Sequence, residues 1–207
     1  TSDEPDRSLV GRVRGSVLLM GPMLARRGRV LFAPPGGDFP TRRTINTHLL
    51  ALEAFGVRIA AAAEGHVLDA PGGLRPASIY LDEASVTGTE TALLAAAAAP
   101  GLSEIRHAAC EPHVVELCEF LRGMGVGISG EGSHTIRVEG VARRSGATRT
   151  LDGDYIEAGS WAVVGAITGG AIEVVGARPV DMEVVASVLT KMHVHCVNDG
   201  TVFRAEA

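Results

Sequence analysis

The 207-residue chain repeats one pattern of apolar and polar residues three times. In each copy an apolar, helix-like segment runs to a glycine and a short strand, at 16–32, 91–105 and 160–174. A second helical segment follows in each copy, and the valines that end it, Val57, Val126 and Val194, recur at intervals of 69 and 68 residues. Near-equal spacing across three copies indicates repeated supersecondary units, so we predict three of them.

The residue pattern within each copy predicts its elements. The first helix is apolar almost all round, as in the five alanines at 95–99, which predicts burial on every side. The second helix is amphipathic, with Val114, Cys118 and Leu121 three and four residues apart. Alternating segments with a Glu-Gly or Asp-Gly turn follow, and they predict hairpins at 58–70, 127–140 and 195–206.

Copies two and three also begin with a strand-like segment, at 77–85 and 147–155, so the unit reads β-α-β-α-β-β. Copy one has no such segment, and we expect the parent protein to continue upstream of it. These elements predict an α/β fold of three βαβαββ units.

Composition restricts the class of protein. The net charge of −5 and a pI near 5.8 argue against nucleic-acid binding, which needs a basic face. The cysteines Cys110, Cys118 and Cys196 form no C-x-x-C pair, so we expect neither a metal site nor a disulfide framework, and a cytoplasmic protein. No apolar run reaches membrane-spanning length, which predicts no membrane partner. We expect no cofactor.

Several motifs resemble the enolpyruvyl transferases. RGSVLLMGPMLARRGRV at 14–30 and PPGGDFPTRR at 34–43 are similar to the family's R-A-S, G-P-L-x-A-R and P-G-G-C/D segments. SVTGTETALLAAA at 85–97, HAACEPHVVELC at 107–118 and DYIEAGS at 154–160 match later motifs in the same order. The resemblance covers nearly the whole chain and is closest to the branch that acts on UDP-N-acetylglucosamine.

The resemblance implies an inside-out α/β fold of six βαβαββ units in two domains, with helices inside, sheets outside and the active site between the domains. Three units make half of that architecture. By this alignment residues 1–149 hold repeats one and two, in the domain with the catalytic loop, and residues 150–207 open the second domain. We expect the 207-residue chain to be inactive alone. Sheet edges and apolar faces left by missing units would favour a homodimer.

The implied reaction transfers the enolpyruvyl group of phosphoenolpyruvate to a hydroxyl of UDP-N-acetylglucosamine, a step in peptidoglycan precursor synthesis. Asp38 stands at the Gly-Gly tip where many members have a cysteine, and the resemblance implies that it is the catalytic acid or base. A carboxylate cannot form the thioether of a cysteine, so we expect insensitivity to epoxides that alkylate that thiol. Arg14, with a catalytic role, and Arg43 match the arginines that hold phosphoenolpyruvate.

The nucleotide sugar has its own matched residues. His48 matches a histidine near the nucleotide, and Ser85, Val86 and Thr87 match a loop that contacts the diphosphate. A loop ahead of a buried helix offers free N–H groups to anions, which agrees with that role. Taken alone, a first-turn histidine is more often just a surface residue, and a Ser-Val-Thr-Gly run is a weak signal.

Five ligand-facing positions depart from the family pattern and leave the acceptor open: Thr44, Asn46, Glu83, Cys110 and Tyr155. Glu83 replaces a lysine of the diphosphate site and would repel phosphate. The alternatives are a diverged paralogue with another acceptor, a non-catalytic binding or scaffold module, and other chemistry on the same repeat, such as a shikimate-type transferase or an RNA-end cyclase. The acidic charge balance disfavours the cyclase.

Overall fold

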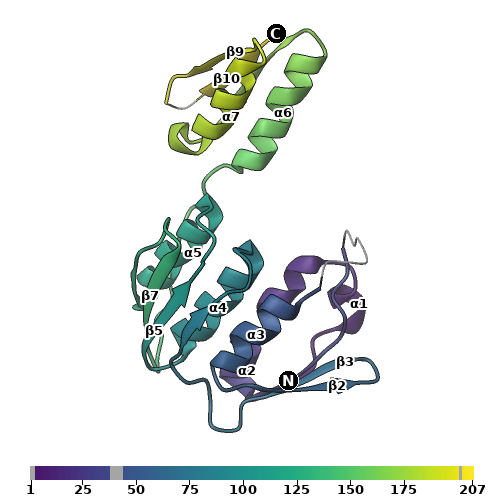
Figure 1. Cartoon of the computed structure of the whole chain (residues 1–207), viewed down its shortest axis with the longest axis vertical. Helices are drawn as coiled ribbons and strands as arrows, with labels where there is room; N and C mark the ends of the chain where they lie inside the picture. Colours follow the sequence, from purple (N-terminus) through teal and green to yellow (C-terminus); the bar gives the residue numbers. More distant parts are fainter. Residues whose placement is uncertain (1–2, 38–43, 201) are drawn as a thin grey trace. The chain divides into compact units, whose positions relative to one another are not determined.

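The computed structural model describes residues 3–37, 44–200 and 202–207, and the chain divides into two compact units, 1–148 and 149–207 (Figure 1). Each unit is mixed α/β. None of the helices in the described ranges has the length and continuous apolarity that a bilayer span requires.

In the part that the structure describes, the first half of unit 1–148 holds four helical segments and a three-stranded sheet. The helical segments are α1 (Arg7–Val10), the 3₁₀ helix η1 (Arg14–Leu19), α2 (Met20–Arg27) and α3 (Asn46–Ala54). The strands are β1 (Arg29–Phe32), β2 (Arg58–Ala62) and β3 (Gly65–Asp69), in the antiparallel order β1-β3-β2.

The second half of that unit has two helices and four strands. The helices are α4 (Val86–Ala98) and α5 (Pro112–Gly123). The strands are β4 (Ser78–Tyr80), β5 (Gly101–Arg106), β6 (Gly127–Ser129) and β7 (Thr135–Gly140). Their order is β4-β5-β7-β6, and β4 runs parallel to β5 while the other pairs are antiparallel.

The unit 149–207 contains α6 (Tyr155–Ile167), β8 (Ala171–Val175), α7 (Pro179–Lys191), β9 (His195–Asn198) and β10 (Val202–Glu206). Its sheet has the order β8-β10-β9. In all three sheets the second hairpin strand therefore lies between the first hairpin strand and the strand that precedes the second helix. The three predicted hairpins are confirmed by this pairing.

The strand expected at 147–155 is wrong, because residues 147–154 form no strand and Tyr155 already begins α6. Thr148, Thr150 and Asp152 supply no apolar face, and Leu151 is 76% exposed, so this segment has nothing to bury against a sheet. Asp152 instead pairs with Arg178 at 2.8 Å. The strand expected at 77–85 does form, as the short β4.

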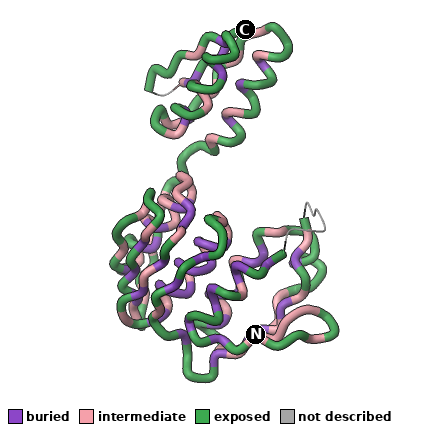
Figure 2. Tube along the Cα trace, in the orientation of Figure 1, coloured by how far each residue is buried: buried purple, intermediate pink, exposed green. Residues whose placement is uncertain are grey.

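Helix α4 occupies the centre of unit 1–148. Its buried residues extend around the whole helix and are mostly small: Gly88, Thr89, Thr91, Ala92, Leu93, Ala95, Ala96 and Ala97. It packs against α2, α3 and α5 (Figures 1 and 2). Because small side chains allow close approach on every side, the alanine-rich sequence becomes the core of the unit.

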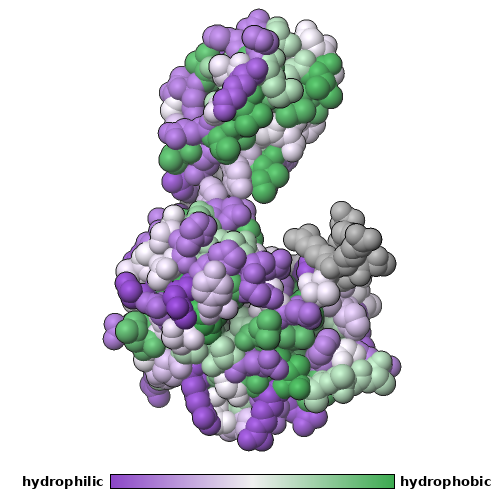
Figure 3. All heavy atoms as spheres, in the orientation of Figure 1, coloured by the Kyte–Doolittle hydropathy of each residue, from purple (hydrophilic) through white to green (hydrophobic). Residues whose placement is uncertain are grey.

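The corresponding helix of unit 149–207, α6, is much less covered. Only Ala158, Ala162 and Gly165 are buried in it, whereas Trp161 and Ile167 are 50% and 77% exposed. Helix α7 also exposes Val184 and Val188. Apolar side chains consequently reach the surface of this unit (Figure 3).

Candidate functional site

The N-terminus of α4 is fixed by a side-chain cap and by a glycine. Ser85 adopts an extended backbone, and its hydroxyl accepts a hydrogen bond from the Gly88 N–H at 3.2 Å, as an N-cap serine does. A Cβ atom at Gly88 would lie 2.8 Å from the Thr47 Cγ2 atom at the start of α3. The absence of a side chain at Gly88 therefore lets the first turns of α3 and α4 meet.

His48 and Thr87 join these two helix starts. The His48 Nε2 atom lies 2.9 Å from the Thr87 hydroxyl, and the imidazole is only 2% exposed. Two of the predicted nucleotide residues thus contact each other, and Ser85 and Val86 lie directly before Thr87. N–H groups in the first turn of a helix lack partners inside that helix, so this junction is suited to anions.

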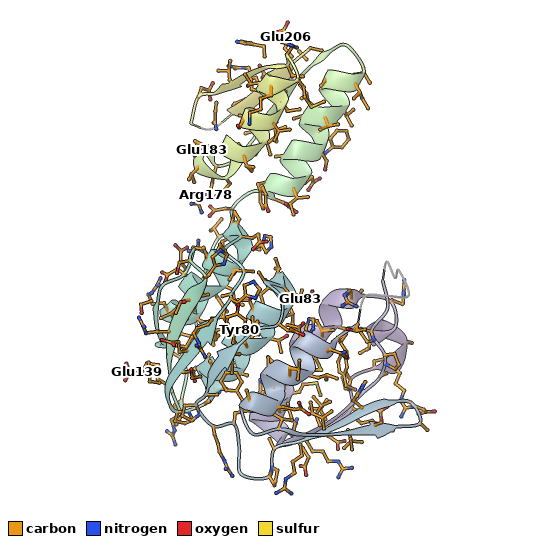
Figure 4. The ribbon with its side chains drawn as sticks, in the orientation of Figure 1. Tyr80, Glu83, Glu139, Arg178, Glu183 and Glu206 are labelled. Carbon is orange, nitrogen blue, oxygen red and sulfur yellow. The ribbon has the colours of Figure 1, made fainter. Side chains whose placement is uncertain are left out.

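Two carboxylates lie at the same junction. The Thr47 hydroxyl is 2.8 Å from Asp82 Oδ1 and 3.1 Å from Glu83 Oε1. A threonine hydroxyl has one hydrogen, so it donates mainly to the nearer oxygen, and the two carboxylates keep most of their acceptor capacity. Glu83 therefore lies close to the start of α3 (Figure 4).

Arg14 lies beside Gly37 and Thr44, the residues on either side of the segment that carries the predicted Asp38 and Arg43. Its Nη2 atom donates to the Thr44 carbonyl at 2.9 Å, and a Cβ at Gly37 would lie 3.0 Å from its backbone nitrogen. Asp38 and Arg43 fall between those two positions and lie outside the described residues. Since Thr44 lies directly before Ile45, the N-cap residue of α3, the start of α3 connects Arg14 with the His48–Thr87 contact.

Glu90, one turn into α4, is a polar residue that the sequence reasoning missed. Burial, and secondly the negative charge of Glu111, raise the pKa of its carboxyl to about 7. Glu111 is the N-cap residue of α5, and Pro112 is its first residue, a position where proline is favoured. A glutamate inside an otherwise apolar helix was the signal that could have identified Glu90.

A second missed cluster follows β5. The Cys110 Sγ atom lies 3.4 Å from His134 Nδ1, and the His107 and His134 ring centroids are 6.4 Å apart. Burial and Glu111 raise the pKa of the Cys110 thiol, so this thiol is not activated as a nucleophile. Among the described residues no three histidine, cysteine or acidic side chains group as metal ligands.

Three of the five positions that depart from the family pattern have a role in the local structure. Thr44 provides the carbonyl that Arg14 binds, Asn46 is the first residue of α3, and Tyr155 is the first residue of α6. Cys110 contacts His134, and only Glu83 places a new charge at the α3–α4 junction.

Comparison with known proteins gives one consistent result. The pattern of the EPSP synthase (3-phosphoshikimate 1-carboxyvinyltransferase) family matches residues 2–206. The UDP-N-acetylglucosamine 1-carboxyvinyltransferase of Treponema denticola is 39% identical over 201 residues, which are 97% of this chain and 46% of that protein. The protein of the same name from Paracoccus denitrificans is 46% identical over 180 residues, 86% of this chain and 42% of its own length.

Solved structures show the same fold. The enolpyruvyl transferase NikO from Streptomyces tendae superposes with a TM-score of 0.79 at 24% identity, over 97% of this chain and 49% of NikO. EPSP synthase from Acinetobacter baumannii gives 0.67 at 19% identity, over 93% of this chain and 46% of its own. The chain thus spans about half the length of the proteins it matches.

Proposed function

Because the chain belongs to the EPSP synthase family of enolpyruvyl transferases, we propose that it contributes to transfer of the enolpyruvyl group of phosphoenolpyruvate to a hydroxyl of UDP-N-acetylglucosamine. In that reaction the acceptor oxygen becomes bonded to the enolpyruvyl carbon, the bond between that carbon and the phosphate oxygen breaks, and the acceptor's proton leaves with the inorganic phosphate. The observation that carries the proposal is the junction of the α3 and α4 N-termini, with Arg14 at the adjoining segment.

The residues at the junction have distinct proposed tasks. The N–H groups of Val86 and Thr87, in the first turn of α4, bind phosphate oxygens of the nucleotide, and the positive end of the helix adds to the attraction. His48 holds the Thr87 hydroxyl in place through their 2.9 Å contact. Arg14 offers a planar guanidinium to the phosphate or carboxylate of phosphoenolpyruvate.

Asp38 and Arg43 complete the proposed site. Asp38 serves as the acid or base that moves the protons of the reaction, and Arg43 provides a second guanidinium for phosphoenolpyruvate. Arg14 lies between the two ends of the segment that contains both of them, which supports a shared location. We also propose that residues 1–149 and 150–207 belong to different domains of a cytoplasmic enzyme.

Ligand titration tests the proposal on the chain itself. Calorimetry should detect binding of UDP-N-acetylglucosamine, and Thr87→Ala should weaken it about threefold to tenfold, because one contact near the phosphates is lost. Arg14→Ala should weaken phosphoenolpyruvate binding, whereas Arg137→Ala, which removes an exposed arginine of β7, should change neither affinity. Absence of heat with both ligands would refute the proposal.

Turnover is a separate measurement. Phosphate release from the two substrates should be negligible for the 207 residues alone. They correspond to only 46% of the Treponema denticola protein, and groups from the remainder would be needed to position the substrates. A longer protein that contains this segment should release phosphate, and Asp38→Ala should abolish that release while UDP-N-acetylglucosamine still binds. Full activity of the Asp38→Ala variant would exclude it as the acid or base.

A further inference from the structure

A cysteine, a histidine and a backbone carbonyl meet where β5 ends and β7 begins (Figure 1). The Cys110 Sγ atom lies 3.4 Å from His134 Nδ1 and 3.8 Å from the Ala108 carbonyl oxygen. The Ala108 oxygen is 2.9 Å from the same His134 nitrogen. One sulfur, one nitrogen and one oxygen thus form a small triangle within unit 1–148. Because His134 is exposed and Cys110 is half-buried, an ion can reach this triangle from solvent.

The sides of the triangle are close to those of a metal-binding face. A tetrahedral Zn²⁺ ion takes sulfur at about 2.3 Å and nitrogen or oxygen at about 2.0 to 2.2 Å. Bonds of that length at about 109° place sulfur about 3.6 Å from nitrogen or oxygen, and nitrogen about 3.4 Å from oxygen. The observed 3.4, 3.8 and 2.9 Å all lie within about 0.5 Å of these values. Small side-chain rotations therefore convert the triangle into one face of a tetrahedral site.

The backbone around the triangle is firmly held. Ala108 is fully buried, and its N–H donates to the His134 carbonyl at 3.1 Å, which continues the β5–β7 ladder. The next N–H, that of Ala109, donates to the Thr89 hydroxyl of α4 at 2.9 Å. Cys110 then directly precedes the N-cap of α5. Since two strands and two helices anchor the segment, binding of an ion needs little ordering of the chain.

The charges around the cluster favour a cation. Burial, and secondly the carboxylate of Glu111, raise the pKa of the Cys110 thiol. The negative charge that disfavours a free thiolate attracts a divalent ion, and a bound metal deprotonates a coordinating thiol outright. The adjacent Arg106 guanidinium pairs with Glu104 at 3.8 Å, which partly offsets its positive charge.

We propose that the Cys110 sulfur, the His134 Nδ1 atom and the Ala108 carbonyl oxygen bind a zinc ion, with water at the fourth position. On binding, the thiol releases its proton to solvent, and the imidazole hydrogen moves from Nδ1 to Nε2, so that Nδ1 becomes a ligand. Sulfur and imidazole ligands select against Mg²⁺ and Ca²⁺, which prefer oxygen. The cysteine spacing that led us to expect no metal site could not reveal this one, because its two side chains are 24 residues apart.

Titration of the 207-residue chain with Co²⁺ tests the proposal, because Co²⁺ replaces Zn²⁺ in such sites and a thiolate ligand gives it an absorption band in the near ultraviolet. We expect the band to saturate at one Co²⁺ per chain and to disappear when Zn²⁺ is added, since Zn²⁺ binds more tightly. Mg²⁺ should not remove it. Cys110→Ser should abolish the band, and His134→Gln should weaken Co²⁺ binding by at least about tenfold.

Two matched controls lie on β9 in the other unit. Cys196 is the other half-buried cysteine and His195 is an exposed histidine, so Cys196→Ser and His195→Gln should both keep the band and the affinity. The proposal is overturned if the unmodified chain shows no thiolate band, if Cys110→Ser retains it, or if His134→Gln binds as tightly as the unmodified chain. The exposed His134 can be replaced without disturbing the core, so this variant decides the question even if Cys110→Ser does not fold.

The metal site goes beyond the proposed function and is independent of it. It uses none of the residues assigned to phosphoenolpyruvate or the nucleotide sugar, and the titration contains neither ligand. Failure of the cobalt experiment therefore leaves the transferase proposal untouched, and failure of the ligand titrations leaves the metal site untouched.

Discussion

Replacing Glu90 by glutamine should remove a pH dependence from the stability of unit 1–148. Burial, and secondly Glu111, disfavour the charge of this carboxyl and raise its pKa to about 7 in the folded chain, from the ordinary glutamate value of 4.5. The folded state therefore binds this proton more tightly than the unfolded state does. The free energy of unfolding must fall as the pH rises from about 4.5 to 7, and the loss is complete above that range.

The size of the loss follows from the shift. A change from 4.5 to about 7 at about 1.36 kcal/mol per unit sets an upper bound of roughly 3.4 kcal/mol. Glu90 is only partly buried, and solvent screening reduces that bound to about 1 to 2 kcal/mol. Glutamine has nearly the same shape and no charge, so Glu90→Gln should be more stable than the natural chain by this amount at pH 8 and nearly equal at pH 4.

Hydrogen–deuterium exchange of α4 peptides in increasing urea provides the assay, because it reports on the first unit alone. The sole tryptophan, Trp161, lies on α6 and would report on the other unit. Glu139→Gln serves as the control, since it removes an exposed carboxylate from the same unit. A stability difference between the Glu90→Gln variant and the natural chain that is the same at pH 4 and pH 8 would refute the reasoning.

Three further predictions concern packing, a thiol and self-association. Gly88→Ala places a Cβ 2.8 Å from Thr47 Cγ2 and should lower the free energy of unfolding by about 1 to 3 kcal/mol in urea titrations; an unchanged midpoint would contradict the packing argument. The Cys118 pKa is raised to about 12, chiefly by burial, so this thiol should react with an aromatic disulfide at pH 8 only after unfolding, unlike a freely reacting surface cysteine. The exposed Val184 and Val188 of α7 should support a homodimer that Val188→Asp disrupts, which sedimentation can measure; a monomer at all concentrations would exclude it.

Much of the fold could be predicted because the information is local. The turn at Asp199-Gly200 and the alternating residues beside it specify the β9–β10 hairpin, and the alanines at 95–99, four of them in α4, predicted burial on all sides. Helix α6 is also apolar in sequence, but most of its residues are not buried. Its exposure depends on which neighbours are present, and periodicity within one helix says nothing about that.

The strand expected at 147–155 failed for a related reason. It resembled the segment that forms β4, but Ile79 in β4 and Leu81 just after it are buried, whereas Leu151 is exposed. Strand formation is set by the face that is covered as well as by alternation. The candidate site also depends on long-range packing that local patterns do not show. The Thr47 hydroxyl contacts Asp82 and Glu83, which lie 35 and 36 positions further along the chain.

Added salt should weaken binding at the proposed anion site. The N-terminus of α4 would attract phosphate through its N–H groups and the positive end of the helix, and added ions screen this attraction. Raising the salt concentration from about 0.05 to 0.5 M should therefore weaken binding of UDP-N-acetylglucosamine severalfold, which calorimetry can measure. An affinity that does not change with salt would mean that charge at this helix end does not hold the phosphates, and the assignment of Val86 and Thr87 to the anion site would be wrong.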